Sequence, residues 1–277
     1  MTINLKELED AELKDLITEY YKKYYMTQLG LPDWNERIRL RLNEEQNYCE
    51  KYIALIEKWF SYDFNGKKVL IVGCGTGGEI INFFRRGADT YGIDPSSEAL
   101  KISQKKLELN GLPIKNVRKA FSEDLPYKDN EFDFIYCFTV IEHVTDIKKS
   151  LSEMVRCVKN KGKIFIETPD YRNCYEGHYK LPLPMFLPKW FNRIILTILG
   201  RPSEFLRTIN KVNSRIMQKF FNDLPVTSFK IDKDNQRKLP KRKLNFSYLA
   251  ELINFMNYKF FLISKNQIWI LEKRQND

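Results

Sequence analysis

The sequence predicts an α/β protein built on a doubly wound, mostly parallel sheet, and three observations lead to this prediction. From residue 68 onward, short apolar runs alternate with amphipathic segments, as in strands joined by helices. The first apolar run, 69–72, ends abruptly in a cluster of glycines, as a buried strand does when it turns tightly into a helix. Two runs near the end of the sequence, 259–265 and 267–272, are separated by one residue and predict an antiparallel hairpin.

The individual elements follow in order along the chain. Leucines and isoleucines at helical spacing predict helices over residues 5–28 and 35–62, separated by a turn at 30–33. The runs that predict strands are 68–74, 89–94, 114–121, 132–140 and 162–168. The segments between them predict helices over 77–86, 96–110 and 146–160, with Ser96 and Asp146 as N-caps and a helix stop at 160–162.

Residues 170–245 interrupt this alternation, because several prolines punctuate their apolar stretches. The alternating pattern resumes with a predicted helix at 246–258. The chain is therefore expected to have three parts. They are an N-terminal helical cap of residues 1–64, a core formed by 65–169 and 246–277, and a basic helical insert of residues 170–245 that follows the fifth strand and serves as a substrate lid.

The composition limits the class of protein. At 277 residues with a hydrophobic fraction of 43%, the chain is expected to fold around one core with room for an appended cap. It has no run of about 20 uncharged apolar residues, so no membrane span is expected. The five cysteines lack CxxC spacing, and the first ten residues do not resemble a signal peptide. These features predict reduced thiols, no structural zinc and a cytoplasmic location.

Positive charge is concentrated in one part of the chain. The net charge of the whole chain is +10, and residues 171–245 alone carry sixteen basic and five acidic side chains. Such a local excess predicts an anionic partner. The alternative, that the basic residues only keep a loop solvated, stays open at this point.

The glycine-rich turn and a lone carboxylate predict a site for a nucleoside cofactor. Gly73 and Gly75 let a ligand approach backbone N–H groups. Asp94 ends the next predicted strand, where a carboxylate can accept both hydroxyls of a ribose or cap a helix. With Gly78, these glycines also satisfy the dinucleotide fingerprint. The two preceding helices, the terminal hairpin and the segment 122–133 argue against a dinucleotide domain.

These features together resemble the class I S-adenosylmethionine-dependent methyltransferases, especially the branch similar to ubiquinone- and menaquinone-biosynthesis methyltransferases. The resemblance covers residues 66–170 and 246–273. The motifs that carry it are Val72–Gly77, Gly92–Asp94, Glu123–Pro126 with Phe132–Asp133, and Gly162–Pro169. It implies a seven-stranded sheet with an antiparallel last strand. It also implies methyl transfer as the activity, with S-adenosylmethionine as the cofactor and S-adenosylhomocysteine as its product.

The resemblance also implies which residues bind the cofactor. The glycine loop and the end of the fourth strand are expected beside the methionine part, the end of the second strand beside the ribose, and the segment after the third strand beside adenine. The implied residues are Gly73, Cys74, Gly75, Gly77, Asp94, Pro95, Ser122, Glu123 and Phe138. Two positions depart from the family. Ile71 replaces an acid that helps hold the cofactor's amino group, and Phe121 replaces an aspartate aimed at the adenine amine, although its ring can still pack against adenine.

The only two histidines are candidates for acid–base chemistry. His143 follows the fourth predicted strand and His178 follows the fifth, so both are expected in loops at the carboxyl edge of the sheet. Glu142 and Glu176 lie nearby in the sequence and could orient a histidine or raise its pKa. The catalytic candidates are therefore His143, His178 and Glu142, and the alternative is a structural role.

A metal site at these residues is not expected. Some relatives, including small-RNA 2′-O-methyltransferases, hold Mg²⁺ with a Glu-x-x-Glu-His motif and a further histidine. In this chain Thr139 stands in place of the first glutamate. The remaining residues offer too few carboxylates for the oxygen shell that a hard cation prefers.

The insert is expected over the same edge of the sheet and supplies candidate substrate-binding residues. These are Arg172, Tyr175, Tyr179 and Lys180. Their aromatic and basic character suits an anionic acceptor. Together with the cofactor motifs and the two histidines, it predicts O-methylation of a small anionic molecule, such as a phosphorylated sugar, a surface-glycan intermediate or a natural-product intermediate. The alternatives are an RNA methyltransferase that binds phosphates through residues 230–243, a peripheral membrane contact through 181–199, and a non-catalytic binding role. The sequence is compatible with a monomer or a homodimer.

Overall fold

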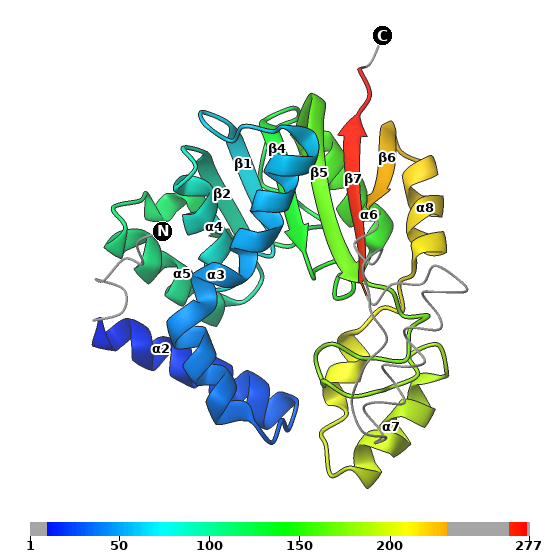
Figure 1. The fold of residues 1–277 in the computed structure, drawn as a ribbon. Coiled ribbons are helices and arrows are strands. Elements are labelled where there is room, and N and C mark those ends of the chain that lie inside the picture. Colours follow the sequence, from blue (N-terminus) through cyan, green and yellow to red (C-terminus); the bar gives the residue numbers. More distant parts are fainter. Residues whose placement is uncertain (1–9, 232–265, 276–277) are drawn as a thin grey trace.

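A seven-stranded sheet forms the centre of the molecule (Figure 1), which is a computed structural model that describes residues 10–231 and 266–275. The strand order is β3-β2-β1-β4-β5-β7-β6. Six strands are parallel to one another, and β7 is antiparallel to its neighbours β5 and β6. The strands are β1 (Lys68–Val72), β2 (Asp89–Asp94), β3 (Val117–Lys119), β4 (Phe132–Phe138), β5 (Val158–Pro169), β6 (Val226–Ile231) and β7 (Asn266–Lys273). The predicted fold class is confirmed.

Helices and helical turns connect and extend this sheet. They are α2 (Ala11–Lys22), the π-helical η1 (Lys23–Gln28), α3 (Trp34–Phe60), α4 (Gly78–Phe84), α5 (Ser97–Leu109), η2 (Ile114–Asn116), α6 (Ile147–Cys157), α7 (Lys189–Ile198), η3 (Glu204–Thr208) and α8 (Ser214–Asn222). Both predicted N-caps are confirmed. The Ser96 hydroxyl accepts from the backbone N–H of Ala99, and the Asp146 carboxylate accepts from that of Lys149.

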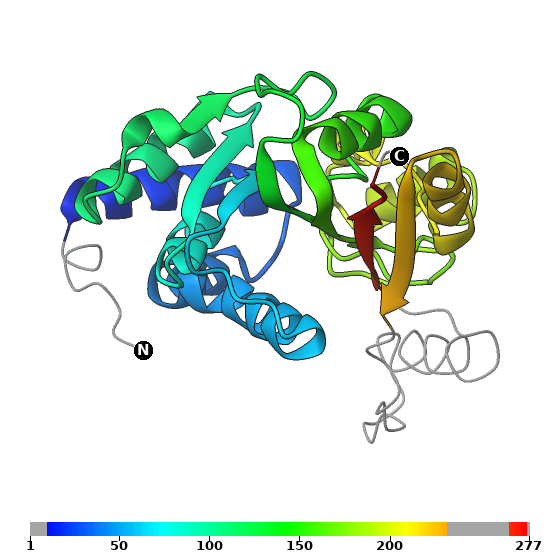
Figure 2. The same ribbon diagram turned by 90° about the horizontal axis from the view of Figure 1, so that it is seen from above.

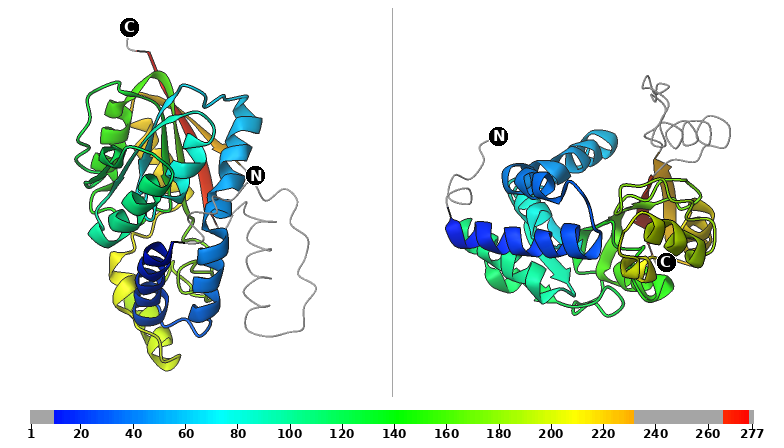
Figure 3. Two further views of the ribbon diagram at one scale, coloured as in Figure 1. Left: turned by 90° about the vertical axis from the view of Figure 1, so that its left-hand side faces the viewer. Right: turned by 90° about the horizontal axis from the view of Figure 1, so that it is seen from below.

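The alternation of side chains along β1 explains why both faces of the sheet are covered. Val69 and Ile71 point to one face and pack with α3 and α4, whereas Leu70 and Val72 point to the other face and pack with α6. All four side chains are at most 1% exposed. The left view of Figure 3 shows the blue α3 and the green α6 on opposite sides of the sheet.

Two predicted boundaries are wrong. The helix expected to continue to residue 160 ends at Cys157, because Val158 is already extended and pairs with Phe132 of β4. Residues 160–162 therefore lie inside β5 and do not stop a helix. The third strand is also shorter than predicted, since its first residues form the turn η2.

The sheet takes one strand from the segment that the sequence assigned to the insert. Strand β6 pairs with β7 along its whole length and, with α8, closes one edge of the sheet (Figure 2). Residues 259–265, which were expected to form a hairpin with the last strand, lie outside the described residues, as does the predicted helix at 246–258. Both edges of β7 are paired, with β5 on one side and β6 on the other.

The carboxyl ends of the parallel strands face two added segments. Figure 1 shows α2 and α7 on this side of the sheet, at its left and right. Helix α2 packs against α3 and α5, and its apolar side chains join the same core cluster as those of the insert. Within the described residues, no helix has the length and apolar character needed to cross a bilayer. These segments place the functional site between the N-terminal helices, the sheet and the insert.

Candidate cofactor and acceptor site

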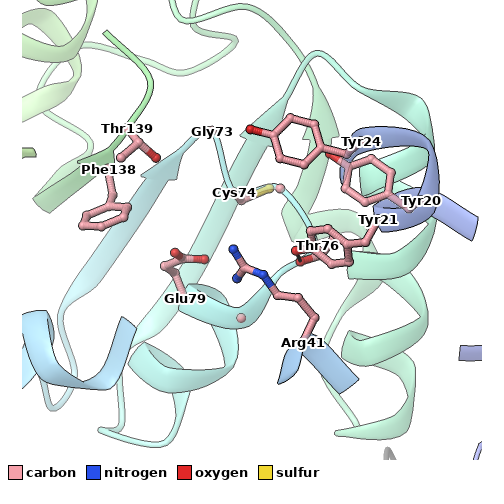
Figure 4. A pocket seen from close by; sticks show the side chains of 12 residues that line it. Tyr20, Tyr21, Tyr24, Arg41, Gly73, Cys74, Thr76, Glu79, Phe138 and Thr139 are labelled. Atoms are coloured by element: carbon pink, nitrogen blue, oxygen red, sulfur yellow. Dashed lines mark hydrogen bonds between the residues drawn. The ribbon is translucent and has the colours of Figure 1, made fainter. Parts of the chain in front are cut away.

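A cavity opens at the carboxyl ends of β1 and β4 (Figure 4). It has a volume of about 180 Å³ and is open to solvent. Residues from five elements (α2, η1, α3, α4 and β4), from the glycine loop and from the end of β4 line it. They are Tyr20, Tyr21, Tyr24, Arg41, Gly73, Cys74, Gly75, Thr76, Gly78, Glu79, Phe138 and Thr139.

The glycine loop forms the floor of the cavity, and glycine is needed at positions 73 and 75 for different reasons. Gly73 has a φ of +70°, and a Cβ there would lie 2.3 Å from Cγ2 of Val140, so the loop and the end of β4 can approach only without a side chain. Gly75 has a φ of +49°, but a Cβ there would meet no atom within 4 Å. Because Gly75 lines the cavity, that Cβ would occupy space open to a ligand.

Asp94 holds this loop in place. Its two carboxylate oxygens accept hydrogen bonds from the backbone N–H groups of Gly75 and Ser96, at 2.9 and 2.8 Å. Burial raises the pKa of the Asp94 carboxyl. Asp94 thus joins the glycine loop to the start of α5. Each carboxylate oxygen retains a second lone pair for a ligand hydroxyl.

The residues predicted beside adenine are tied to the start of α6. Ser122 accepts a hydrogen bond from the hydroxyl of Ser150, and Glu123 accepts one from the backbone N–H of Thr145. Neither side chain lines the cavity, and the same holds for Gly77, Asp94 and Pro95. Phe121, in contrast, is 61% exposed, so its ring has a face free to pack against a planar ligand.

The side chains that the sequence did not single out come from the N-terminal helices. Arg41 reaches the cavity from α3 and donates from Nε to the hydroxyl of Tyr25 at 2.9 Å, with its guanidinium 5.0 Å from the centroid of the Tyr21 ring. Figure 4 shows Arg41 facing Glu79 of α4. Tyr24 lies in the π-helical turn, a feature that often marks functional sites. The four tyrosines at residues 20–25 are visible in the sequence, but nothing near them indicates that they reach the glycine loop.

Thr139 connects the cavity to the histidines. It follows β4 with a φ of +53°, an unusual backbone conformation for a β-branched residue, and its backbone N–H donates to the carbonyl of Glu167. The conformation places Thr139 in the cavity wall, four residues before His143. The strain is therefore located where the cofactor pocket meets the acid–base residues.

The structure brings together the two histidines, which are 35 residues apart in sequence. The Nε2 atoms of His143 and His178 are 3.2 Å apart. His178 Nδ1 lies 2.6 Å from Oε1 of Glu176, and His143 Nδ1 lies 3.4 Å from the hydroxyl of Thr208. The ring of Phe205 contacts both imidazoles and also Tyr24, so the pair lies next to the cavity.

Burial and neighbouring charges give the two histidines different proton affinities. Burial and the proximity of His178 lower the pKa of His143 to about 4. Burial also opposes protonation of His178, but the charge of Glu176 and its hydrogen bond outweigh burial and raise the pKa of His178 above its usual value. His143 is therefore neutral at neutral pH, and His178 is the more basic of the pair.

Glu142 is the third member of this cluster and is fully buried. Its Oε2 accepts a hydrogen bond from Thr168 at 2.9 Å, whereas its Oε1 has no hydrogen-bond partner among the described residues. Burial raises the pKa of Glu142 to about 7. One ligand atom each of Glu142, His143 and His178 lies within 4.8 Å of the other two.

Comparison with known proteins identifies one domain of the chain. Residues 70–166 match the family model described as a methyltransferase domain. This part of the chain is similar to the class I S-adenosylmethionine-dependent methyltransferases. The cavity fits the cofactor of this family, because the open side of Gly75 and the cationic Arg41 offer backbone and charged contacts to a small zwitterion.

Curated relatives and solved structures agree with this assignment. The chain is 26% identical over 149 residues to a ubiquinone biosynthesis O-methyltransferase of Photorhabdus laumondii. This alignment covers 46% of the chain and 62% of that protein. It is 31% identical over 103 residues to the protein of the same name from Klebsiella pneumoniae, which covers 37% of this chain and 43% of that protein. The chain thus matches less than two thirds of the length of these relatives.

The fold likeness extends further than the sequence likeness. An S-adenosylmethionine-dependent methyltransferase from Archaeoglobus fulgidus superposes with a TM-score of 0.50 at 16% identity, covering 83% of this chain and 97% of that one. Geranyl diphosphate C-methyltransferase from Streptomyces coelicolor superposes with a TM-score of 0.52 at 16% identity, covering 80% and 76%. These matches extend the likeness in fold beyond residues 70–166.

The predicted substrate residues do not line the cofactor cavity. Arg172 forms a two-point ion pair with the buried Asp170, which fixes the start of the insert. Tyr179 is fully buried, and its backbone N–H donates to Glu176 at 2.6 Å. Tyr175 is partly buried and Lys180 is exposed. The insert residues that contact the histidine pair are instead Glu176 and Phe205.

Proposed function

We propose that this methyltransferase transfers the methyl group of S-adenosylmethionine to a hydroxyl of a small anionic molecule. The observation that carries this proposal is the histidine pair next to the cofactor cavity, because an oxygen acceptor needs a proton acceptor and methyl transfer to it is an in-line displacement. The names of the curated relatives, which are O-methyltransferases, support an oxygen acceptor.

The glycine loop, Asp94 and Arg41 would bind and orient the cofactor. Backbone N–H groups of the loop and the guanidinium of Arg41 suit the methionine carboxylate, and Asp94 suits the ribose hydroxyls. Phe138 lines the same cavity and packs edge-to-face against Tyr52, with ring centroids 4.7 Å apart. These residues would hold the methionine part of the cofactor, whose sulfonium would supply the methyl group.

His178 is the proposed base, and Glu176 is its positioning partner. In the reaction, a lone pair of the acceptor oxygen forms the new bond to the methyl carbon, the carbon–sulfur bond breaks, and the sulfonium becomes a neutral thioether. The hydroxyl proton passes to the histidine pair. Glu176 favours this transfer because its carboxylate stabilises the imidazolium form of His178.

Replacement of His178 tests this role. We expect His178→Ala to reduce turnover by about 100- to 10,000-fold, the usual contribution of a general base, while S-adenosylhomocysteine binds as before. The readout is transfer of labelled methyl into small-molecule extracts, with S-adenosylhomocysteine affinity measured by calorimetry. Unchanged turnover in His178→Ala would show that the histidine is not the base.

The exposed apolar side chains of α7 favour an acceptor that is carried at a membrane surface. Trp190, Ile194 and Ile198 are spaced four residues apart and are 62%, 50% and 78% exposed, so they form one apolar stripe. Lys189 and Arg193 lie on the same helix and suit anionic headgroups. The proposed occupant of this stripe is the surface of an anionic bilayer.

The RNA alternative rests mainly on residues 230–243. All but the first two of these residues lie outside the described part of the chain. Within residues 10–231 and 266–275, the basic side chains of Arg172 and Arg201 bind partners inside the protein, namely Asp170 and the carbonyl of Leu29. The small-molecule acceptor is therefore the better-supported function.

A further inference from the structure

The cluster of Glu142, His143 and His178 has the geometry of a metal site. Two imidazole nitrogens that each lie about 2.0–2.1 Å from one ion in near-tetrahedral geometry are about 3.3 Å apart. The Nε2 atoms of His143 and His178 are 3.2 Å apart. The ligand atom of Glu142 lies within 4.8 Å of both.

The remaining polar atom of each of these three side chains is held by a neighbour. Thr168 donates to Oε2 of Glu142, Glu176 contacts Nδ1 of His178, and Thr208 contacts Nδ1 of His143. The two Nε2 atoms face each other, and Oε1 of Glu142 has no hydrogen-bond partner among the described residues. Metal sites in proteins are built in this way, because outer partners fix the tautomer and orientation of each ligand.

A shared proton alone does not satisfy this cluster. A proton between the two Nε2 atoms would account for their separation, but Oε1 of the fully buried Glu142 would remain without a partner. A second carboxylate, Glu176, is also buried. A divalent cation would give Oε1 of Glu142 a partner and balance negative charge in this buried cluster.

We propose that Glu142, His143 and His178 bind one divalent first-row transition-metal ion, of which zinc is the probe of choice. Two imidazoles and one carboxylate suit such an ion, whereas magnesium prefers an oxygen shell. This inference revises the expectation of no metal, which considered only magnesium.

The role of the ion rests on the proposed function, whereas its binding does not. With three protein ligands, the ion has an open position for the oxygen of the acceptor. Its charge would lower the pKa of the acceptor hydroxyl, so that the proton leaves to water and the oxygen attacks the methyl carbon. The histidines then act as ligands in the ion-bound form and as proton acceptors in the ion-free form.

The test uses the full chain without a histidine tag, after treatment with a chelator. Calorimetric titration is expected to show one Zn²⁺ per chain, bound at least about 10-fold more tightly than Mg²⁺. Absence of Zn²⁺ binding, or equal affinity for both ions, overturns the proposal. Cys174 is the one partly exposed thiol of the four described, so Cys174→Ser controls for binding through sulfur and should bind Zn²⁺ unchanged.

Variants locate the site. Glu142→Gln and His178→Ala should weaken Zn²⁺ binding by more than about 10-fold, and Glu176→Gln by about 10- to 100-fold, since it loses an outer partner of a ligand. Glu204→Gln, on the exposed surface of the insert, is the matched control and should bind normally. Equal affinity in Glu142→Gln, His178→Ala and the control would overturn the assignment.

A measurement on the unmodified chain covers the case in which a variant fails to fold. The chain has only two histidines, so selective ¹⁵N labelling gives two resolvable imidazole rings. Zn²⁺ should shift the Nε2 signals of both rings, and unchanged signals at saturating Zn²⁺ overturn the proposal. Since neither readout needs turnover, loss of methyl transfer with intact Zn²⁺ binding would count against the proposed function alone.

Discussion

Replacing Gly73 or Gly75 by alanine should separate the loss of stability from the loss of cofactor binding. Gly73 and Gly75 both have positive φ, so either alanine adds about 1–2 kcal/mol of backbone strain. Gly73→Ala also places a Cβ 2.3 Å from Cγ2 of Val140, which forces the end of β4 to move and adds about 1–3 kcal/mol. The expected losses of unfolding free energy are therefore about 2–5 kcal/mol for Gly73→Ala and about 1–2 kcal/mol for Gly75→Ala.

Gly75→Ala, the less destabilising of the two substitutions, should be the one that directly weakens cofactor binding. The new Cβ of Gly75→Ala points into the cavity and meets no protein atom. It should weaken S-adenosylhomocysteine binding by about 10-fold or more, which is 1.4 kcal/mol, in a chain that is still well folded. Urea unfolding followed by circular dichroism measures stability, and calorimetry measures affinity.

A double-mutant cycle tests the cause of the Gly73 effect. Val140→Ala removes Cγ2, so the second substitution should recover most of the clash component in the Gly73→Ala background. The backbone strain should persist. If Gly73→Ala is as stable as Gly75→Ala, or if Val140→Ala gives no recovery, the packing argument for this loop is refuted.

Three further outcomes are expected. Arg41→Met should weaken S-adenosylhomocysteine binding by about 10- to 150-fold, because a hydrogen bond to a charged group contributes about 1.5–3 kcal/mol. The control is Arg39→Met, which should leave the affinity measured by calorimetry unchanged, because the guanidinium of Arg39 pairs with Glu36. In metal-free protein, the methyl-transfer rate should rise with pH through an apparent pKa above the usual 6.5 of histidine, because Glu176 raises the pKa of His178. Glu176→Gln should move this rise to lower pH. An unshifted pH profile would exclude Glu176 as the positioning partner. Ile198→Asp should reduce co-sedimentation with phosphatidylglycerol vesicles by about 10-fold or more, and equal sedimentation would remove the membrane role of α7.

The core of the fold was predictable because its signals are local. The buried run 69–72, the glycine turn and the N-caps Ser96 and Asp146 each appear in a few adjacent residues, and the structure has each of them where the sequence placed it. Family motifs added the seven strands and the cofactor. The helix stop at 160–162 failed because pairing with β4 outweighed the local turn signal.

The walls of the site depended on contacts between distant segments. Arg41 and the tyrosines of residues 20–25 reach the glycine loop only because α2 and α3 pack at the carboxyl edge of the sheet. Strand β6 was assigned to the insert because its pairing with β7 lies nearly 40 residues away in sequence. The sequence carries no local signal for such contacts.

The sequence by itself determined the fold class, the glycine loop and the scarcity of histidines, since these depend on residue type and spacing. Only the tertiary structure decided that His143 and His178 meet at 3.2 Å, that Glu142 is buried beside them with one oxygen unpartnered, and that Arg172 binds Asp170. The physical reason is that a side chain's chemistry depends on burial and on its neighbours. Both are set by how the insert packs against the end of the sheet.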